Sequence, residues 1–269
     1  IKKISIGKSE LRDILGKNGE SVVVAGSDSI CRIHVHTNHP AELFHQLKDI
    51  GTITYQKVDD MVRQQETALH RKWNIALVTD STCDLPKELI DHYQIHMVPV
   101  SINFGDQQFL DKVTIQPAQF YEMLETHADL PKTSLVNVQA FTNLYSHLAS
   151  HYDVITALHL SGQFSGTYAN SVKAGERIKK EFNKPVHVID SKGISGTLGL
   201  LVLKTARRIE AGEGVESIVK SVGDDLSNAK VFVSVRDLKY MIRSGRVSRP
   251  KGLIAGLLGL NPVISLDEN

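Results

Sequence analysis

Residues 154–180 restrict the fold more than any other part of the chain, because they combine a strand, a turn and a helix in direct succession. The run VITALHL is apolar, SGQFSGT is rich in glycine and hydroxyl side chains, and YANSVKAGERIKK suits a helix. A helix that begins in such a turn presents unpaired N–H groups at its positive end, so we expect an anion site at residues 161–167. The turn lacks the GxxxxGK[ST] pattern of a phosphate-binding loop, which favours a small anion such as a carboxylate over a polyphosphate.

The chain from residue 74 onward repeats this alternation. Strands are predicted at 74–80, 95–104, 154–160, 185–189 and 230–235, and helices at 86–93, 117–127, 138–151, 167–180, 197–212, 214–228 and 236–246. This order predicts an α/β fold with a mostly parallel, Rossmann-like sheet that helices cover on both faces. The apolar run 253–260 is too short to span a bilayer and indicates a buried helix, or the wall of a channel for an apolar ligand.

Residues 1–70 are predicted to form a separate small α+β module. It has expected helices at 9–19 (capped by Ser9) and 40–49, strands at 21–26, 29–37 and 52–58, and a charged helical run that leads into a linker after Gln64. The region 74–269 is expected to have two lobes, about 74–155 with parts of 156–212, and 213–269. Because the sequence starts at Ile1 and stops just after a predicted strand, we expect it to be a piece of a longer protein with an incomplete C-terminus.

Two histidines in the first module, His34 and His36, are weak candidates for a metal site. Strand alternation places both on one face and Cys31 on the other, and two ligands are too few for a stable zinc site. A third ligand would have to come from His39 or from sequence before Ile1. We favour two histidines on a half-exposed strand, with no metal.

Composition excludes several classes of function. A net charge of +1 indicates neither a nucleic-acid partner nor stable membrane insertion, and two distant cysteines do not form a disulfide framework. With no signal peptide and no membrane span, the chain is expected to be cytoplasmic.

Hydroxyl-rich turns follow three of the predicted strands, and one further loop has the same character. In parallel sheets, ligands bind beyond the carboxyl ends of the strands, so these loops predict one shared site. They lie at residues 80–82, 161–167 and 190–196, and at Thr133-Ser134. A basic stretch indicates a solvated face or the docking of an acidic partner or a phosphate, and comprises Arg236, Lys239, Arg243, Arg246, Arg249 and Lys251.

Five ordered motifs in residues 74–269 resemble the DegV family. They are VTDSTCDLP, KTSLVN, LSGQFSGTYANS, VIDSKGISGTLGL and IRSGRVS…GLLGLNPVIS. The first module, with its strand IHVHTNHP, resembles part of the large subunit of a fatty acid kinase. This resemblance implies a bacterial DegV-type protein that binds a long-chain fatty acid in a tunnel. It would present the acid to a fatty acid kinase, fused or separate, that makes an acyl phosphate for phospholipid synthesis. A dihydroxyacetone-kinase-like domain that binds ATP and Mg would precede Ile1, and no cofactor is expected in this chain.

The resemblance also assigns roles to particular residues. Those implied to bind the carboxylate are Thr133, Ser134 and Ser165, with the N–H groups of Gly166 and Thr167, and Ser81, Thr82, Ser191 and Ser195 lie in possible secondary loops. Arg246 would dock the kinase, and no catalytic residue is implied. The chain departs from the family pattern at Leu135-Val136, where Gln-Pro is usual, and at Ser244-Gly245, where the family has Gly-Gly. A late histidine of the family would lie past Asn269.

Two alternatives to lipid binding remain open at this point. The same loops could serve an enzyme that acts on a small phosphorylated or carboxylated metabolite, with His159 or His187 approaching Ser165. We expect both histidines to be satisfied core residues instead, and no nucleophile–base pair is evident. Nucleotide binding is the weakest alternative, because no GxGxxG follows a strand.

Overall fold

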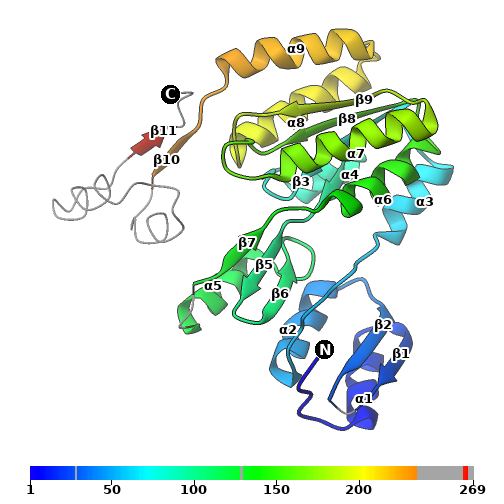
Figure 1. Ribbon diagram of the computed structural model, residues 1–269, viewed down its shortest axis with the longest axis vertical. Coiled ribbons are helices and arrows are strands. Elements are labelled where there is room, and N and C mark those ends of the chain that lie inside the picture. Colours follow the sequence, from blue (N-terminus) through cyan, green and yellow to red (C-terminus); the bar gives the residue numbers. More distant parts are fainter. Residues whose placement is uncertain (28, 128–129, 235–262, 266–269) are drawn as a thin grey trace. The chain divides into compact units, whose positions relative to one another are not determined.

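The computed structural model describes residues 1–27, 29–127, 130–234 and 263–265 (Figure 1). The chain divides into two compact units that each combine segments distant in sequence. Unit 1 comprises Ile1–Asp59 and Pro99–Ser134, and unit 2 comprises Asp60–Val98 and Leu135–Asn269.

Unit 2 contains the parallel sheet that the alternation predicted. Its strands pair in the order β4-β3-β8-β9, all in parallel. They are β3 (Ile75–Asp80), β4 (His96–Val98), β8 (Val154–His159) and β9 (Val186–Asp190). The α/β class is therefore confirmed.

Helices cover both faces of this sheet (Figure 1). On one face lie α6 (Val138–Ala149) and α7 (Thr167–Phe182), and on the other lie α4 (Lys87–His92), α8 (Gly196–Glu210) and α9 (Val215–Asn228). Successive residues of β8 serve the two faces, because side chains alternate along a strand. Leu158 packs in the core with Leu198 and Val202 of α8, whereas the ring of His159 lies 4.9 Å from that of Phe141 on α6.

Unit 1 has two antiparallel sheets, β1-β2 and β6-β5-β7. Its elements are α1 (Lys8–Asn18), β1 (Glu20–Gly26), β2 (Cys31–His36), α2 (Pro40–Ile50), β5 (Ser101–Phe104), β6 (Gln107–Leu110), α5 (Pro117–Thr126) and β7 (Lys132–Ser134). One core joins leucines of α1 and α2 to Phe104 and Phe109. The Gln107 side chain adds polar contacts, since it accepts from the Ile53 N–H at 2.7 Å and donates to the Lys48 carbonyl at 2.9 Å.

Several predicted elements differ from the structure. The strand predicted at 95–104 is interrupted at Pro99, which has no N–H to donate, and its halves β4 and β5 join different sheets. The strand predicted at 52–58 is reduced to a single bridge between Thr52 and Lys2. Gly7, not Ser9, precedes α1 as its N-cap. The predicted loop at Thr133-Ser134 is strand β7, and β6 was not predicted.

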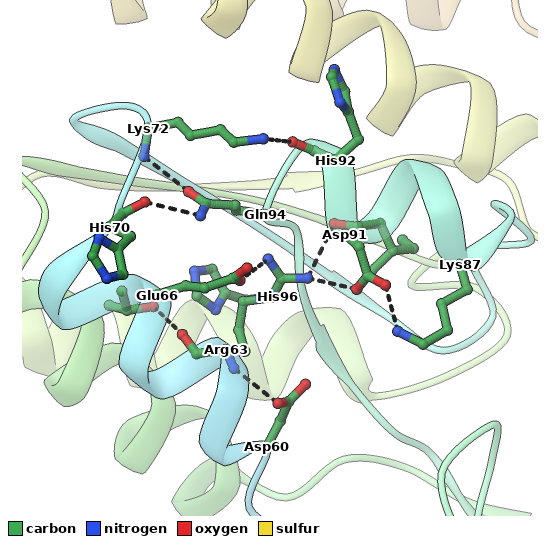
Figure 2. A network of polar contacts seen from close by, with 12 residues as sticks. Asp60, Arg63, Glu66, His70, Lys72, Lys87, Asp91, His92, Gln94 and His96 are labelled. Atoms are coloured by element: carbon green, nitrogen blue, oxygen red, sulfur yellow. Dashed lines mark hydrogen bonds and ion pairs between the residues drawn. The ribbon is translucent and has the colours of Figure 1, made fainter. Parts of the chain in front are cut away.

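The predicted charged helical run is helix α3 (Met61–Leu69), which continues past Gln64 and packs within unit 2 through polar residues (Figure 2). The buried Arg63 guanidinium lies 2.6 Å from a Glu66 oxygen and 2.8 Å from Asp91 of α4, while Met61 and Leu69 are exposed. Because its buried face is charged, α3 is attached by charge-assisted hydrogen bonds.

The end of the chain is described only in part. Strand β10 (Phe232–Ser234) pairs antiparallel with β11 (Val263–Ser265). The predicted helix at 236–246, the apolar run at 253–260 and Arg246 lie outside the described residues. Among the helices that the structure describes, none is long and apolar enough to cross a membrane.

Candidate functional site

Three turns meet at the carboxyl edge of the parallel sheet, as the alternation predicted. The turn after β8 contacts the turn after β9, because the Ser161 N–H donates to the Gly193 carbonyl at 2.9 Å. The turn after β9 contacts the turn after β3, because the Ser195 N–H donates to the Thr82 carbonyl at 3.0 Å. The hydroxyl-rich residues of the three turns therefore lie at one edge.

A buried polar network lies beneath these turns. One oxygen of the fully buried Asp80, Oδ2, accepts from the Leu160 N–H at 2.9 Å and lies 3.1 Å from His159 Nδ1. The other, Oδ1, accepts from the Thr82 hydroxyl at 2.6 Å and from the Thr82 N–H at 3.0 Å. On the far side of the imidazole, His159 Nε2 lies 3.4 Å from the Tyr145 hydroxyl, which is 2.6 Å from Ser171 Oγ.

The surroundings keep Asp80 ionised. Burial by itself raises the pKa of a carboxyl group, but the hydrogen bond and charge of His159, with the bonds from Thr82 and Leu160, outweigh burial and lower the pKa of Asp80. Burial raises the pKa of Tyr145, so its hydroxyl stays neutral. The network thus holds an ionised carboxylate, paired with His159, at the base of the turns.

His159 is the satisfied core histidine that we expected. Its side chain is fully buried, and both ring nitrogens lie within hydrogen-bond distance of a partner. It is therefore not free to act as a general base for Ser165. His187, which was expected to be similar, is only half-buried on β9.

Within the described residues, the hydroxyl proton of Ser165 has no acceptor. Its Oγ accepts from the Thr167 N–H at 3.2 Å and lies 2.9 Å from Thr167 Oγ1, which accepts from the Val136 N–H at 3.3 Å. Thr167 is fully buried and has no other acceptor among the described residues, so its hydroxyl donates to Ser165. The proton of the half-buried Ser165 remains available for a ligand.

Backbone donors lie beside this hydroxyl at the start of α7. Gly166 is the exposed N-cap of this 16-residue helix, and within the described chain the N–H groups of Ser165 and Gly166 have no acceptor. The Thr167 N–H, in contrast, donates to Ser165 Oγ. Leu135, 48% exposed, comes within 3.1 Å of the place where a Cβ on Gly166 would lie. Free donors and an exposed apolar side chain are thus neighbours.

Hydroxyls of the possible secondary loops are already used as donors. Thr82 donates to Asp80, Ser195 donates to an Asp84 oxygen at 2.6 Å, and Ser191 donates to the Gly193 carbonyl at 3.2 Å. Ser81 is fully buried. Since a carboxylate needs donors, these side chains are poorly suited to bind it.

Thr133 and Ser134 lie on β7 in unit 1 and are both exposed. The Asn103 side chain donates to Ser134 Oγ at 3.1 Å. Two residues further on, Val136 belongs to unit 2, where its carbonyl accepts from the Asn170 side chain at 2.9 Å. That Thr133 and Ser134 share a site with Ser165 stays a prediction.

The paired histidines of β2 face each other, with 3.1 Å between the Nε2 atoms of His34 and His36. Cys31 is buried, and its thiol donates to the Ser27 carbonyl at 3.1 Å. It therefore does not share the exposed face of the two histidines, as strand alternation predicted. Within the described ranges no group of three or more His, Cys, Asp or Glu side chains could hold a metal ion.

Sequence reasoning placed Asp80 in the turn 80–82 without a role of its own, and it did not identify Tyr145 or Ser171. One signal could have identified Asp80: it closes the apolar strand IALVTD, and a carboxylate at the end of a buried strand needs partners. The partners themselves come from α6 and α7, far along the chain, so their identity depends on packing.

A parallel α/β sheet with polar turns at its carboxyl edge is typical of a ligand-binding domain. The model for uncharacterised proteins of the DegV family matches residues 74–269, and the model for the FakA-like middle domain of fatty acid kinases matches residues 2–68. The chain therefore belongs to the DegV family and carries a FakA-like middle domain before its DegV region.

Relatives and solved structures agree with this assignment. Protein DegV of Bacillus subtilis is 32% identical over 196 residues, which are 72% of this chain and 69% of that protein. A DegV domain-containing protein of Clostridium perfringens is 34% identical over 193 residues, 71% of this chain and 68% of that protein.

The crystal structure of DegV from Bacillus subtilis, described as a fatty acid binding protein, has a TM-score of 0.66 at 31% identity and covers 73% of this chain and 69% of that chain. A stearic acid-binding protein from Eubacterium ventriosum also has a TM-score of 0.66, at 28% identity, with 73% and 67% covered. These matches confirm the DegV-type fold.

Proposed function

We propose that this chain binds a long-chain fatty acid and that the turn between β8 and α7 holds the carboxylate. The Ser165 hydroxyl and the Gly166 N–H would donate to the acid group, and Leu135 would contact the first methylene groups. The observation that carries this proposal concerns the described part of the chain: the Ser165 proton and the Gly166 N–H have no acceptor there, and both lie at a helix start beside an exposed leucine.

The solved relatives support a lipid as the ligand, since DegV of Bacillus subtilis and the Eubacterium ventriosum protein are described as binding fatty acids. Burial of the tail would supply most of the affinity. At about 0.8 kcal/mol for each buried CH₂ group, a C16 chain contributes on the order of 10 kcal/mol before ordering costs.

Neutral donors suit a carboxylate that has to react. An arginine fork would bind the acid more tightly and shield the attacking oxygen, whereas hydroxyl and N–H donors leave it nucleophilic. In the proposed reaction, a carboxylate oxygen attacks the γ-phosphorus of ATP. The bond from that phosphorus to the bridging oxygen breaks, ADP leaves and an acyl phosphate forms. ATP and Mg would be held by a kinase domain outside this chain, and the match at residues 2–68 supports such a partner.

The alternative, an enzyme that acts on a small carboxylated or phosphorylated metabolite, is disfavoured by the state of His159. Both nitrogens of that ring have partners, and the ring is fully buried. Among the residues that the structure describes, Ser165 therefore lacks the neighbouring base that an activated serine requires.

Ligand identity can be tested on the purified chain by native mass spectrometry and by calorimetric titration with oleate, oleyl alcohol and a sugar phosphate. We expect native mass spectrometry to show bound host fatty acid and calorimetry to show tight binding of oleate. Oleyl alcohol should bind at least about tenfold more weakly than oleate, because it lacks the charged acceptor. Equal affinity for the alcohol would contradict the head-group assignment. Binding of the sugar phosphate without oleate binding would support the alternative.

Arg246, which lies outside the described residues, is proposed to engage the kinase. We expect Arg246→Ala to leave the oleate affinity unchanged and to lower the yield of acyl phosphate when a fatty acid kinase and ATP are supplied. A loss of oleate binding would place this arginine in the lipid site instead.

A further inference from the structure

The buried Asp80 carboxylate connects all three turns of the candidate site. It accepts directly from Thr82 in the turn after β3 and from Leu160, the residue before the turn after β8. Its partner His159 accepts at the main-chain carbonyl from the Ser191 N–H, at 3.0 Å, in the turn after β9. One charged group and one histidine thus link turns that follow three different strands.

A chain of short contacts leads from Asp80 to Ser165. Leu160 is followed by Ser161, whose carbonyl accepts from the Phe164 N–H at 3.0 Å and whose Oγ accepts from the Gln163 N–H at 3.3 Å. These bonds close the turn directly before Ser165. A displacement of the Leu160 N–H would therefore move the hydroxyl that is proposed to meet the ligand.

We propose that Asp80, held by His159, is the positioning residue of this site, and that it sets the placement of the Ser165 hydroxyl and the Gly166 N–H without touching the ligand. This inference rests on the proposed function, because the consequence of the positioning is measured as ligand affinity.

The arrangement of donors around Asp80 requires an ionised carboxylate. Two donors, both from Thr82, meet Oδ1, and the Leu160 N–H and His159 Nδ1 meet Oδ2. An asparagine has one acceptor oxygen and one NH₂ group, so either orientation of its amide would place that NH₂ group against a main-chain N–H donor, that of Thr82 or that of Leu160. In a fully buried site, such an unsatisfied pairing displaces the groups involved.

Thr79 offers a matched control on the same strand. It is fully buried, and its hydroxyl has no hydrogen-bond partner in the described part of the chain. Thr79→Val keeps the shape and removes only this unused hydroxyl, so it reports the effect of a buried substitution in β3 without a change in the turns.

The test is a calorimetric titration of the whole chain with oleate for Asp80→Asn, Ser165→Ala, the double variant and Thr79→Val. We expect Asp80→Asn to weaken oleate binding at least about tenfold, and to cost at least about threefold less when Ser165 is already alanine. The losses in melting temperature of the two single variants should instead add up in the double variant, because Asp80 stabilises the fold independently of the Ser165 hydroxyl. Thr79→Val should stay within about twofold of the wild-type affinity.

Two results would overturn the proposal. One is an Asp80→Asn variant that binds oleate as tightly as the wild type, and the other is an Asp80→Asn substitution that weakens oleate binding by the same factor in the wild type and in Ser165→Ala. If Asp80→Asn does not fold, Tyr145→Phe takes its place, because it removes only the hydroxyl that bridges His159 and Ser171. We expect a loss of about threefold there, and unchanged affinity would overturn the proposal.

Amide hydrogen exchange separates this inference from the proposed function. Asp80→Asn should speed exchange at Thr82, Leu160 and Ser191, one amide for each turn, while Thr79→Val should not. A wild-type chain that binds no oleate refutes the proposed function, and the exchange rates then decide whether Asp80 positions the turns. Unchanged exchange at all three amides refutes the positioning.

Discussion

The turn that joins β8 to α7 and the turn that joins β9 to α8 have nearly the same ingredients but different hydrogen bonding. Both follow a parallel strand, both contain serine and glycine, and both open a long helix. In the first, Thr167 supplies hydrogen bonds to the Ser165 oxygen, and the Ser165 proton has no acceptor in the part of the chain that the structure describes. In the second, Ser195 donates to Asp84. The acceptor that lies next to each hydroxyl therefore decides whether a serine in such a turn keeps a proton for an anion.

Carboxylates support the two turns in opposite ways. Asp80 lies beneath the turn after β8, fully buried, and binds main-chain and side-chain donors. Asp84 is exposed and occupies a serine hydroxyl directly. Asp80 thus positions turns whose other donors are proposed to bind the ligand, whereas Asp84 itself accepts the hydroxyl proton of Ser195.

The largest contrast is expected when each carboxylate is removed. Asp80→Ala removes the partner of four polar contacts in a buried site, and we expect a loss of about 3–5 kcal/mol in the free energy of unfolding. Asp84→Ala acts at the surface and should cost less than about 1 kcal/mol. Denaturant titration of both variants measures the difference in unfolding free energy. Equal losses would contradict the distinction between Asp80, which supports the turns, and Asp84, which only accepts a hydrogen bond from Ser195.

The pH dependence of the Asp80 contribution sharpens this contrast. The pKa of Asp80 is lowered from its ordinary value of 3.8, because its partners outweigh the effect of burial. The stabilisation is therefore fully present above that value and is lost as the pH falls through the lower pKa of the folded state. We expect the gap in unfolding free energy between wild type and Asp80→Ala to be constant from about pH 7 to 5 and to shrink only below about pH 4. A gap that closes near neutral pH would show that Asp80 is not held ionised.

Ser165→Ala and Ser195→Ala compare the two serines directly. A hydrogen bond to a charged group contributes about 1.5–3 kcal/mol, so Ser165→Ala should weaken oleate binding roughly 10- to 100-fold. Ser195→Ala should change the affinity less than about threefold, because its proton is already committed to Asp84. Calorimetric titration gives both values, and a larger loss for Ser195 would move the acid group to the other turn.

The smallest effect is expected for the glycines at the two helix starts. A Cβ on Gly166 would lie 3.1 Å from Leu135 Cδ2, so Gly166→Ala requires that side chain to shift. We expect a loss of about threefold in oleate affinity. A Cβ on Gly196 would meet nothing within 4 Å, and Gly196→Ala should leave affinity unchanged while raising stability by up to about 1 kcal/mol. Loss of affinity in Gly196→Ala alone would again favour the turn after β9.

Local pattern was sufficient for most of the secondary structure and for the parallel sheet. Apolar runs that end in hydroxyl-rich turns predicted β3, β8 and β9; the first two are buried almost throughout, and a strand buried on both faces has few polar positions. The pattern failed at residues 95–104, where Pro99 separates β4 from β5. Short strands such as β6 and β7 were missed, because three or four residues carry too little periodicity.

The sequence by itself determined the α/β class, the meeting of three turns at one sheet edge, and the candidate anion site at residues 161–167, since these follow from strand and turn composition. Tertiary structure alone decided which hydroxyl can donate. Ser165, Ser191 and Ser195 are the same residue type, and only their neighbours distinguish them: Thr167, the Gly193 carbonyl and Asp84. A hydrogen bond depends on distance and direction between atoms, and these come from the packing of elements that lie far apart in the chain.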